Sequence, residues 1–309
     1  MNTSTTISND VKRRHDFVLL FDVTDGNPNG DPDAGNLPRT DPDTMQGLVT
    51  DVAIKRKVRD FVDVAKKDEK DASRYKIYVQ HRGILANQQK RAFDALGKEP
   101  ASQPDDDARM WMCENFYDIR LFGAVMTTGK SPQKGKQWNC GQVRGPLQLT
   151  FARSNDPINT IELPITRVAL TNAGDTGREV TGDEEFASSG QIGRKAIVPY
   201  GLYRAHGFFN PNYANDTGVT EDDLALFWQA IQMMWDLDHS ASRGLMSCRG
   251  LYVFSHESHL GNAPAHTLFE RITVARNPEV AAPRVFNDYT VTVNKADLPA
   301  GVALTALVG

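Results

Sequence analysis

Apolar residues along this chain fall into two patterns, short continuous runs and repeats at helical spacing. The clearest run is FVLLFDV at residues 17–23, which is followed directly by the turn-forming residues DGNPNG. A near-continuous apolar run of β type that ends in turn chemistry predicts a buried strand. We expect a long loop after it, at residues 25–47, because four prolines and four glycines there prevent a regular element.

Two segments show the spacing of amphipathic helices. The first begins after Thr50 or Asp51 and runs to about residue 65, with its apolar positions facing the core. Those positions are Ile54, Val58, Phe61 and Val62. The second and clearer helix begins at Thr220, where three acidic residues in the first turn suit both a capping box and the helix dipole.

Further strands are predicted at residues 75–79, 146–151, 161–170, 251–255, 271–274 and 289–293, and at 196–209 as one long strand or a strand pair. Residues 80–148 have the character of an insertion, with a helix over 107–126 and a Gly/Lys/Gln loop over 128–144. We expect an exposed hairpin end at 171–190 and a flexible tail at 1–14. The resulting order predicts an α+β core that resembles a split β-α-β sheet.

Composition places the chain among ordinary globular proteins. Its 309 residues with 40% hydrophobic content suffice to bury a sizeable core. The length predicts either about two domains or one core with large insertions. No run approaches the roughly 18 apolar residues of a membrane span, and the polar start lacks a secretory signal, so we expect a cytoplasmic protein without membrane contact. Three widely spaced cysteines favour free thiols over disulfides: Cys113, Cys140 and Cys248.

The net charge of −4 and the pI near 6.0 count against an ordinary nucleic-acid-binding domain, which is usually basic. Residues 186–215, however, contain no Asp or Glu and combine cations with several aromatic residues. The cations are Arg194, Lys195, Arg204 and His206. Cations attract phosphates, and aromatic rings stack on unpaired bases at about 1–3 kcal/mol each, which favours single-stranded nucleic acid. A core strand with buried aromatic rings and solvated cations is an equally good interpretation.

The predicted helix after Thr50 carries a second group of cations. Lys55 and Arg59 lie one turn apart and share a face, with Arg56 beside them. A solvated helix surface is the usual fate of such a run. Two other positive features favour phosphate binding over a solvated surface. They are Arg39 in the preceding loop and an acid-free Gly/Lys loop. That loop contributes three lysines, Lys130, Lys134 and Lys136.

The turn DHSASRG at 238–244 is a third candidate, because short hydroxyls, backbone N–H groups and an Arg form an anion-binding concavity. Enzyme signatures are weaker. The aspartates between residues 25 and 43 could bind a divalent metal, but their spacing does not match an EF-hand, and turns use Asp to bond their own backbone. His256, His259 and Cys248 lack zinc-site spacing, and there is no phosphate-loop, nucleophile-elbow or dinucleotide motif. We predict no catalytic residue, metal or cofactor.

Several long blocks resemble one known family. They are FDVTDGNPNGDPDAGNLPR at 21–39, GLVTDVAIKRKVR at 47–59, DIRLFG at 118–123, GRKAIVPYGLYR at 193–204, DHSASRG at 238–244 and LYVF at 251–254. Together they are similar to the Cas7 family of backbone subunits in type I CRISPR interference complexes, and within it to the type I-C branch. The resemblance covers nearly the whole chain after the first 14 residues.

The resemblance implies a modified RNA-recognition-motif (ferredoxin-like) core, called the palm, with a large finger-like insertion and a thumb-like β-hairpin. Residues 15–80 would begin the palm, 81–145 would form the insertion, and 146–309 would complete the palm, with the thumb at about 166–194. Such subunits stack along a guide RNA, kink it at regular intervals and present it for pairing with target DNA in an antiviral surveillance complex. The implied partners are further copies of the chain and the large, guide-processing and small subunits of Cascade.

The resemblance also assigns guide-RNA contacts to the loop, the helix, the returning thumb strand and the turn. The residues are Asn27, Asn29, Arg39, Lys55, Arg56, Arg59, Gln191, Arg194, Lys195, Ser240, Ser242 and Arg243. It places Lys130, Lys134 and Lys136 near the target strand, and it makes the aromatics at 200–209 a core strand that anchors the thumb. A non-enzymatic subunit is therefore the leading prediction. The alternative is a metal-dependent ribonuclease that uses the aspartate-rich loop around Asp31 and Asp33, because a type III relative cleaves RNA with a loop aspartate.

Overall fold

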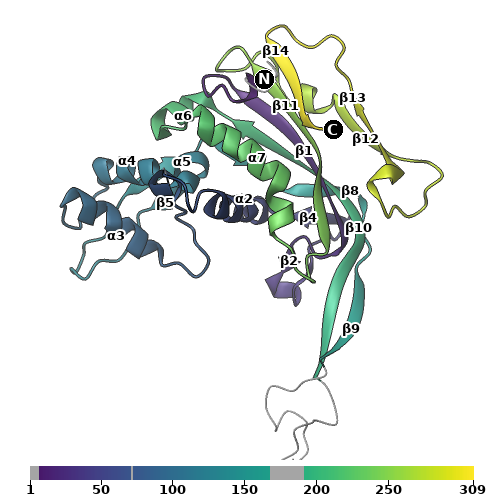
Figure 1. Ribbon diagram of the computed structural model, residues 1–309, viewed down its shortest axis with the longest axis horizontal. Helices are drawn as coiled ribbons and strands as arrows, with labels where there is room; N and C mark the ends of the chain where they lie inside the picture. The colour runs from purple at the N-terminus through teal and green to yellow at the C-terminus, as the bar shows by residue number, and fades with distance from the viewer. Residues whose placement is uncertain (1–6, 71, 168–190) are drawn as a thin grey trace, which may run out of the picture.

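The computed structural model describes residues 7–70, 72–167 and 191–309 and is built around one eight-stranded sheet (Figure 1). Its strands are β1 (His15–Gly26), β4 (Gln46–Val49), β7 (Leu147–Leu149), β8 (Ala152–Pro157), β9 (Ile161–Arg167), β10 (Gln191–Phe209), β11 (Leu245–His256) and β14 (Val302–Val308). Their order is β14-β11-β1-β10-β8-β4, with β7 and β9 also paired to β10. Every pairing in this sheet is antiparallel.

The predicted strand at 17–23 is confirmed as the centre of β1. Its side chains alternate between two apolar clusters, with Phe17 and Leu19 in one and Val18 and Leu20 in the other. Both faces of β1 are therefore buried, which explains why its sequence is a continuous apolar run rather than an alternating one.

Two predicted helices are confirmed, and both cover one face of the sheet. They are α2 (Asp51–Ala65) and α7 (Glu221–Leu237), which lie against it in Figure 1. The Thr50 side chain caps α2 by accepting from the Ala53 N–H, and Thr220 forms a capping box with Asp223 at the start of α7. Their apolar faces join the odd-numbered residues of β1 in the largest core cluster.

The C-terminal segment covers the opposite face of the sheet. It contributes α8 (Ala265–Phe269), β12 (Ile272–Arg276) and β13 (Tyr289–Val293), which pack on the even-numbered residues of β1. The two predicted C-terminal strands are confirmed as the β12-β13 pair. Strand β14 was not predicted and extends the main sheet next to β11.

The segment expected as an insertion packs around a hydrophobic cluster of its own. It holds α3 (Leu85–Leu96), α4 (Asp106–Asn115), α5 (Tyr117–Phe122), β5 (Gly123–Met126) and β6 (Gly141–Arg144). The prediction of one helix over 107–126 is wrong, because Phe116 has extended backbone angles and separates α4 from α5. Helix α3 was missed, since half of its buried positions are glutamines, Gln88 and Gln89.

Two further expectations are wrong. Residues 75–79 form no strand: Tyr75 is the last residue of η2 (Ala72–Tyr75), and the Tyr78 and Val79 N–H groups donate to the Asp118 carboxylate instead of to a neighbouring strand. Residues 7–14 are not a free tail, because Ser8 is buried and its carbonyl accepts a hydrogen bond from Trp228 Nε1.

Residues 196–209 belong to one long strand rather than a strand pair. The first part of β10 pairs with β9, and this two-stranded arm extends away from the body of the protein (Figure 1). Most of the hairpin expected at 166–194 lies outside the described residues. No helix in the described ranges is long and apolar enough to cross a membrane.

Candidate nucleic-acid interface

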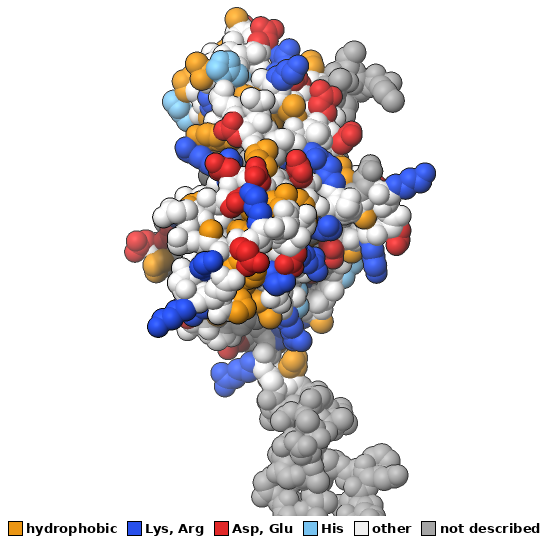
Figure 2. All heavy atoms as spheres, turned by 90° about the vertical axis from the view of Figure 1, so that its left-hand side faces the viewer, with side chains coloured by type: hydrophobic (Ala, Val, Ile, Leu, Met, Phe, Trp, Pro, Cys, Tyr) orange, Lys and Arg blue, Asp and Glu red, His pale blue; other side chains and the backbone are white. Residues whose placement is uncertain are grey.

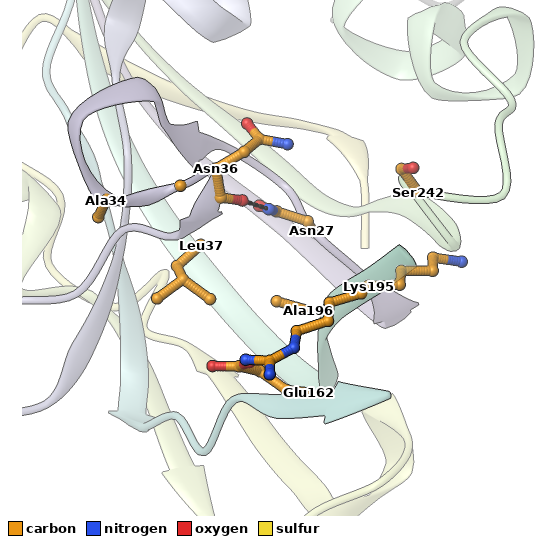
Figure 3. Close-up of a pocket in the computed structure, with 10 residues that line it drawn as sticks. Asn27, Ala34, Asn36, Leu37, Glu162, Lys195, Ala196 and Ser242 are labelled. Atoms are coloured by element: carbon orange, nitrogen blue, oxygen red, sulfur yellow. Dashed lines mark hydrogen bonds and ion pairs between the residues drawn. The ribbon is translucent and has the colours of Figure 1, made fainter. Parts of the chain in front are cut away.

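A cavity of about 360 Å³ lies where the loop after β1, the base of the arm and the turn after α7 meet (Figure 3). The cavity is lined by four of the residues predicted to contact guide RNA: Asn27, Arg194, Lys195 and Ser242. They come from three segments that are far apart along the chain. Glu162 also lines the cavity, and its carboxylate lies 3.9 Å from the Arg194 guanidinium.

Asn27 joins the loop to the turn. Its backbone N–H donates to the Ser242 carbonyl at 2.8 Å, and its side-chain amide donates to the Asn36 carbonyl at 2.7 Å, the bond drawn in Figure 3. A Cβ atom on the preceding Gly26 would lie 1.9 Å from the Arg243 carbonyl oxygen, so only glycine permits this close approach. The loop and the turn therefore form one continuous surface.

Asn29 and Arg39 hold the rest of the loop in place. The Asn29 side-chain oxygen accepts from the Thr50 N–H at 2.9 Å, which ties the loop to the start of α2. Arg39 is partly exposed and pairs with Asp31 at 3.2 Å. The Arg39 N–H donates to the Asn29 carbonyl at 3.2 Å, and neither residue lines the cavity itself.

The three cations predicted on α2 do not share one exposed face. Lys55 pairs with Asp51 at 2.9 Å and its side chain is 12% exposed, whereas Arg56 is 30% exposed. The position of Arg59 differs from the predicted cationic face. Its side chain is 10% exposed and donates to the buried Asp118 carboxylate at 2.8 Å. This buried ion pair is part of the core, because burying either charge without its partner would destabilise the fold.

A cation that sequence reasoning placed in no site connects α2 to the turn. Lys57 is buried, and its ammonium group contacts the carboxylate of Asp238, which also pairs with Arg243 at 2.8 Å. Burial lowers the pKa of Lys57, and the hydrogen bond that its ammonium group donates to Asp238 opposes that shift. The only sequence signal was a lysine beside the apolar positions of α2.

The remaining predicted contacts lie around the arm and the turn. Ser240 and Ser242 are exposed, and the Ser240 hydroxyl accepts from the Arg243 N–H at 3.2 Å. Arg194 projects into solvent, while Lys195 is half-buried. Gln191 begins β10, but its side chain lies outside the described residues.

The lysines proposed for target contact lie elsewhere. Lys130, Lys134 and Lys136 are exposed on the loop between β5 and β6 of the insertion, and none of them lines the cavity. Figure 2 looks at this end of the molecule and shows Lys and Arg side chains interspersed with Asp and Glu.

The aspartate-rich loop does not support the ribonuclease alternative. The Asp31 carboxylate accepts from the Asp33 N–H at 3.1 Å and pairs with Arg39, so it caps a turn and binds a cation. Asp41 likewise accepts from the Asp43 N–H and pairs with Arg153. Across the described ranges, no three His, Cys, Asp or Glu side chains gather into a possible metal site.

Comparison with known proteins identifies relatives. The chain matches the family model of CRISPR-associated protein Cas7 over residues 13–294. A curated relative, the CRISPR-associated protein Cas7 of Haloferax volcanii, is 25% identical over 235 residues. That match covers 71% of this chain and 64% of the relative, so the chain spans less than two thirds of the relative's length.

Three solved structures are also similar. A CRISPR RNA-guided surveillance complex described as pre-nicking gives a TM-score of 0.47 at 13% identity, covering 78% of each chain. Another CRISPR RNA-guided surveillance complex gives 0.44 at 15% identity, covering 78% of this chain and 68% of the other. The type III-B Cmr-beta complex bound to cognate target RNA gives 0.39 at 10% identity, covering 78% and 61%.

Proposed function

This chain belongs to the CRISPR-associated Cas7 family, and from that premise we propose that it is a non-enzymatic backbone subunit that binds CRISPR guide RNA. In this proposal, copies of the chain oligomerise along the guide, kink it at regular intervals and present it for pairing with target DNA. The complex would act in antiviral defence. The motif blocks of the sequence resemble the type I-C branch, which supports the proposal that the complex is of that type.

The observation that carries the proposal is the cavity between the loop, the arm and the turn. It brings Arg194 and Lys195 together with Asn27 and Ser242, and hydrogen bonds fix the loop against the turn. Cations attract phosphates, and hydroxyl and amide groups hydrogen-bond to sugar and phosphate oxygens, so this combination suits an RNA backbone. Lys55, Arg56, Arg39 and Arg243 would extend the contact from the neighbouring helix and turn.

The order of the sheet supports a palm related to the RNA-recognition motif. Strands β11-β1-β10-β8 are adjacent in that order, with α2 between β1 and β8 and α7 between β10 and β11 along the chain. This is the connectivity of a split β-α-β sheet. The sheet face that lacks helices α2 and α7 is covered by α8, β12 and β13. We therefore propose that the guide binds beside the loop, arm and turn instead of on the sheet face.

The arm supports the thumb assignment, and charge supports stacking. Strands β9 and β10 project from the body beside the cavity that we propose binds the guide. The net charge of −4 is compatible with RNA binding, because only the groove has to be basic and opposed surfaces of neighbouring copies can attract one another. The proposed partners are guide RNA, further copies of the chain, the large, guide-processing and small Cascade subunits, and target DNA through the guide, with contact from Lys130, Lys134 and Lys136.

Neutralising two cations of α2 tests the proposal. Because Arg59 binds the buried Asp118 carboxylate, the informative variant is Lys55→Gln with Arg56→Gln, which changes the largely covered Lys55 and the more exposed Arg56. We expect it to weaken single-stranded RNA binding by about tenfold and to reduce the salt slope by about 0.7 for each phosphate that the variant no longer neutralises.

The matched control is Lys90→Gln with Arg91→Gln, an adjacent Lys-Arg pair that is exposed on α3 in the insertion. We expect its RNA affinity to stay within about twofold of wild type. Equal affinities for the two double variants would contradict the proposed position of the groove.

A further inference from the structure

Asp238 occupies an unusual position, because one carboxylate binds two cations from different segments. It follows α7 directly, and its two oxygens contact the Lys57 ammonium and the Arg243 Nε. Lys57 comes from the middle of α2 and its side chain is 4% exposed, whereas the Arg243 side chain is 39% exposed. The carboxylate therefore lies between a buried anchor and a solvent-facing guanidinium.

The ion pair with Asp238 leaves the terminal donors of the Arg243 guanidinium available. A guanidinium carries five N–H donors in a rigid planar fork, and the Asp238 carboxylate lies 2.8 Å from its Nε as an ion pair. Nη1 and Nη2 donate no hydrogen bond to any residue that the structure describes. The ion pair thus holds the guanidinium beside Asp238 while leaving its terminal donors free.

The backbone that carries Arg243 is held from both sides. The Ser242 carbonyl accepts from the Asn27 N–H, and Gly26 packs directly on the Arg243 carbonyl. Gly244 has φ +62°, in the left-handed region that favours glycine, and a Cβ there would lie 2.2 Å from the Thr24 carbonyl oxygen. With the main chain fixed in this way, the remaining freedom of Arg243 is in its side chain, which Asp238 restrains.

We propose that Asp238 is a positioning residue for RNA binding, which holds the Arg243 guanidinium so that its terminal donors face an RNA phosphate, while Lys57 anchors Asp238. The inference rests on the proposed function and assigns a role to an acidic residue within an RNA-binding surface. Two parallel N–H donors match the geometry of a phosphate, so orienting the fork reduces the freedom that binding must remove.

The positioning role and the net charge of the surface predict opposite effects of removing Asp238 on RNA affinity. A carboxylate near a polyanion repels it, so removing Asp238 should strengthen RNA binding if only net charge mattered. Positioning predicts the reverse. We expect Asp238→Ala to weaken binding of a labelled single-stranded RNA of about 30 nucleotides by about fivefold to tenfold.

A double-mutant cycle on the full-length chain decides between these expectations. If Asp238 acts through Arg243, the double variant Asp238→Ala with Arg243→Ala binds RNA as Arg243→Ala alone does, within about twofold. Both single variants should also show a salt slope reduced by about 0.7, the value for one neutralised phosphate on a single strand.

Two further variants separate positioning from folding. Asp238→Glu keeps the carboxylate that pairs with Arg243 and Lys57, so we expect it to hold affinity to within about twofold of wild type. Asp236→Ala removes an exposed carboxylate two residues earlier and should not weaken binding. An Asp238→Ala chain that binds as tightly as wild type, or that weakens binding equally in the Arg243→Ala background, overturns the positioning role. If the wild-type chain binds no RNA, the proposed function fails, and the positioning role with it.

Discussion

One buried carboxylate, that of Asp118, links three segments of the chain. It accepts from Arg59 Nε at 2.8 Å, from the Tyr78 N–H at 2.8 Å and from the Val79 N–H at 3.1 Å. Asp118 is inaccessible to solvent, so these three donors replace the water that an ionised carboxylate would otherwise bind. The arrangement connects α2 to the insertion through α5.

Removing this carboxylate should destabilise the protein strongly. We expect Asp118→Ala to lower the free energy of unfolding by about 3–5 kcal/mol, because it leaves the Arg59 cation buried without its partner. Urea unfolding followed by circular dichroism measures the change. The control is Asp94→Ala, which breaks an exposed pair with Lys90 and should cost about 0.3–0.5 kcal/mol. Similar destabilisation in both variants would show that Arg59 is not buried as described.

A buried histidine gives the protein a defined response to acid. His15 is inaccessible to solvent: its Nε2 donates to the Asp10 carbonyl at 2.8 Å, and its Nδ1 lies 2.9 Å from the Ser255 hydroxyl. Burial lowers its pKa to about 4, although nearby Asp10 and Asp16 favour the charged form and His256 opposes it. The pKa of His206 is also lowered to about 4, first by burial and then by the neighbouring Arg204.

These shifts set the sign of the pH dependence. Between about pH 6.5 and pH 4 the unfolded chain binds protons at both histidines and the folded chain does not, so stability falls as the pH falls through this window. Above pH 6.5 the contribution is complete. We expect the free energy of unfolding to decrease steadily from pH 7 to pH 4, and His15→Gln to make the slope shallower. A free energy of unfolding that stays constant across this range would contradict the neutral state of both rings in the folded chain.

At the scale of elements, the sequence predicts those with a simple apolar pattern. Strand β1 was predicted from a near-continuous apolar run, and helices α2 and α7 from apolar residues at helical spacing. The break at Phe116 and the buried glutamines of α3 were missed because neither produces a period. The strand expected at 75–79 does not form, because N–H groups of this segment donate to the carboxylate of Asp118, which is distant in sequence.

The arm should be separable from the fold. The β9 side chains Ile161, Leu163 and Ile165 are exposed, and no β9 residue belongs to a described core cluster. Replacing residues 163–195 by an Asn-Gly turn should therefore change the unfolding temperature by less than about 4 °C. The same variant should lose RNA-dependent assembly, because it removes Arg194 and Lys195 from the cavity. Thermal unfolding together with RNA binding checks both parts, and retained assembly would contradict the role of the arm.

At the scale of the whole molecule, the candidate site depends on how distant segments pack. Separate blocks of the sequence predicted four RNA contacts, and the fold brings them to one cavity: Asn27, Arg194, Lys195 and Ser242. The Lys57–Asp238 contact, by contrast, joins positions 181 residues apart, and no local pattern signals it. Residue chemistry therefore indicated the ligand class, while the supporting ion pairs became visible only in three dimensions.

Both faces of the central sheet are covered, one by α2 and α7 and the other by the C-terminal layer. The surface that we propose binds RNA is thus a border where the loop, the arm and the turn meet. A site of this kind can be continued from one copy of the chain to the next along an extended strand of RNA, as the proposed backbone role requires.

Native mass spectrometry of the purified chain with single-stranded RNAs of increasing length tests whether copies of the chain bind repeatedly along RNA. We expect the bound mass to rise in steps of one 34.2 kDa chain as the RNA is lengthened by equal increments. The variant lacking residues 163–195 should form no such series. A single bound copy on every RNA regardless of length, or no binding at all, would contradict the proposed function.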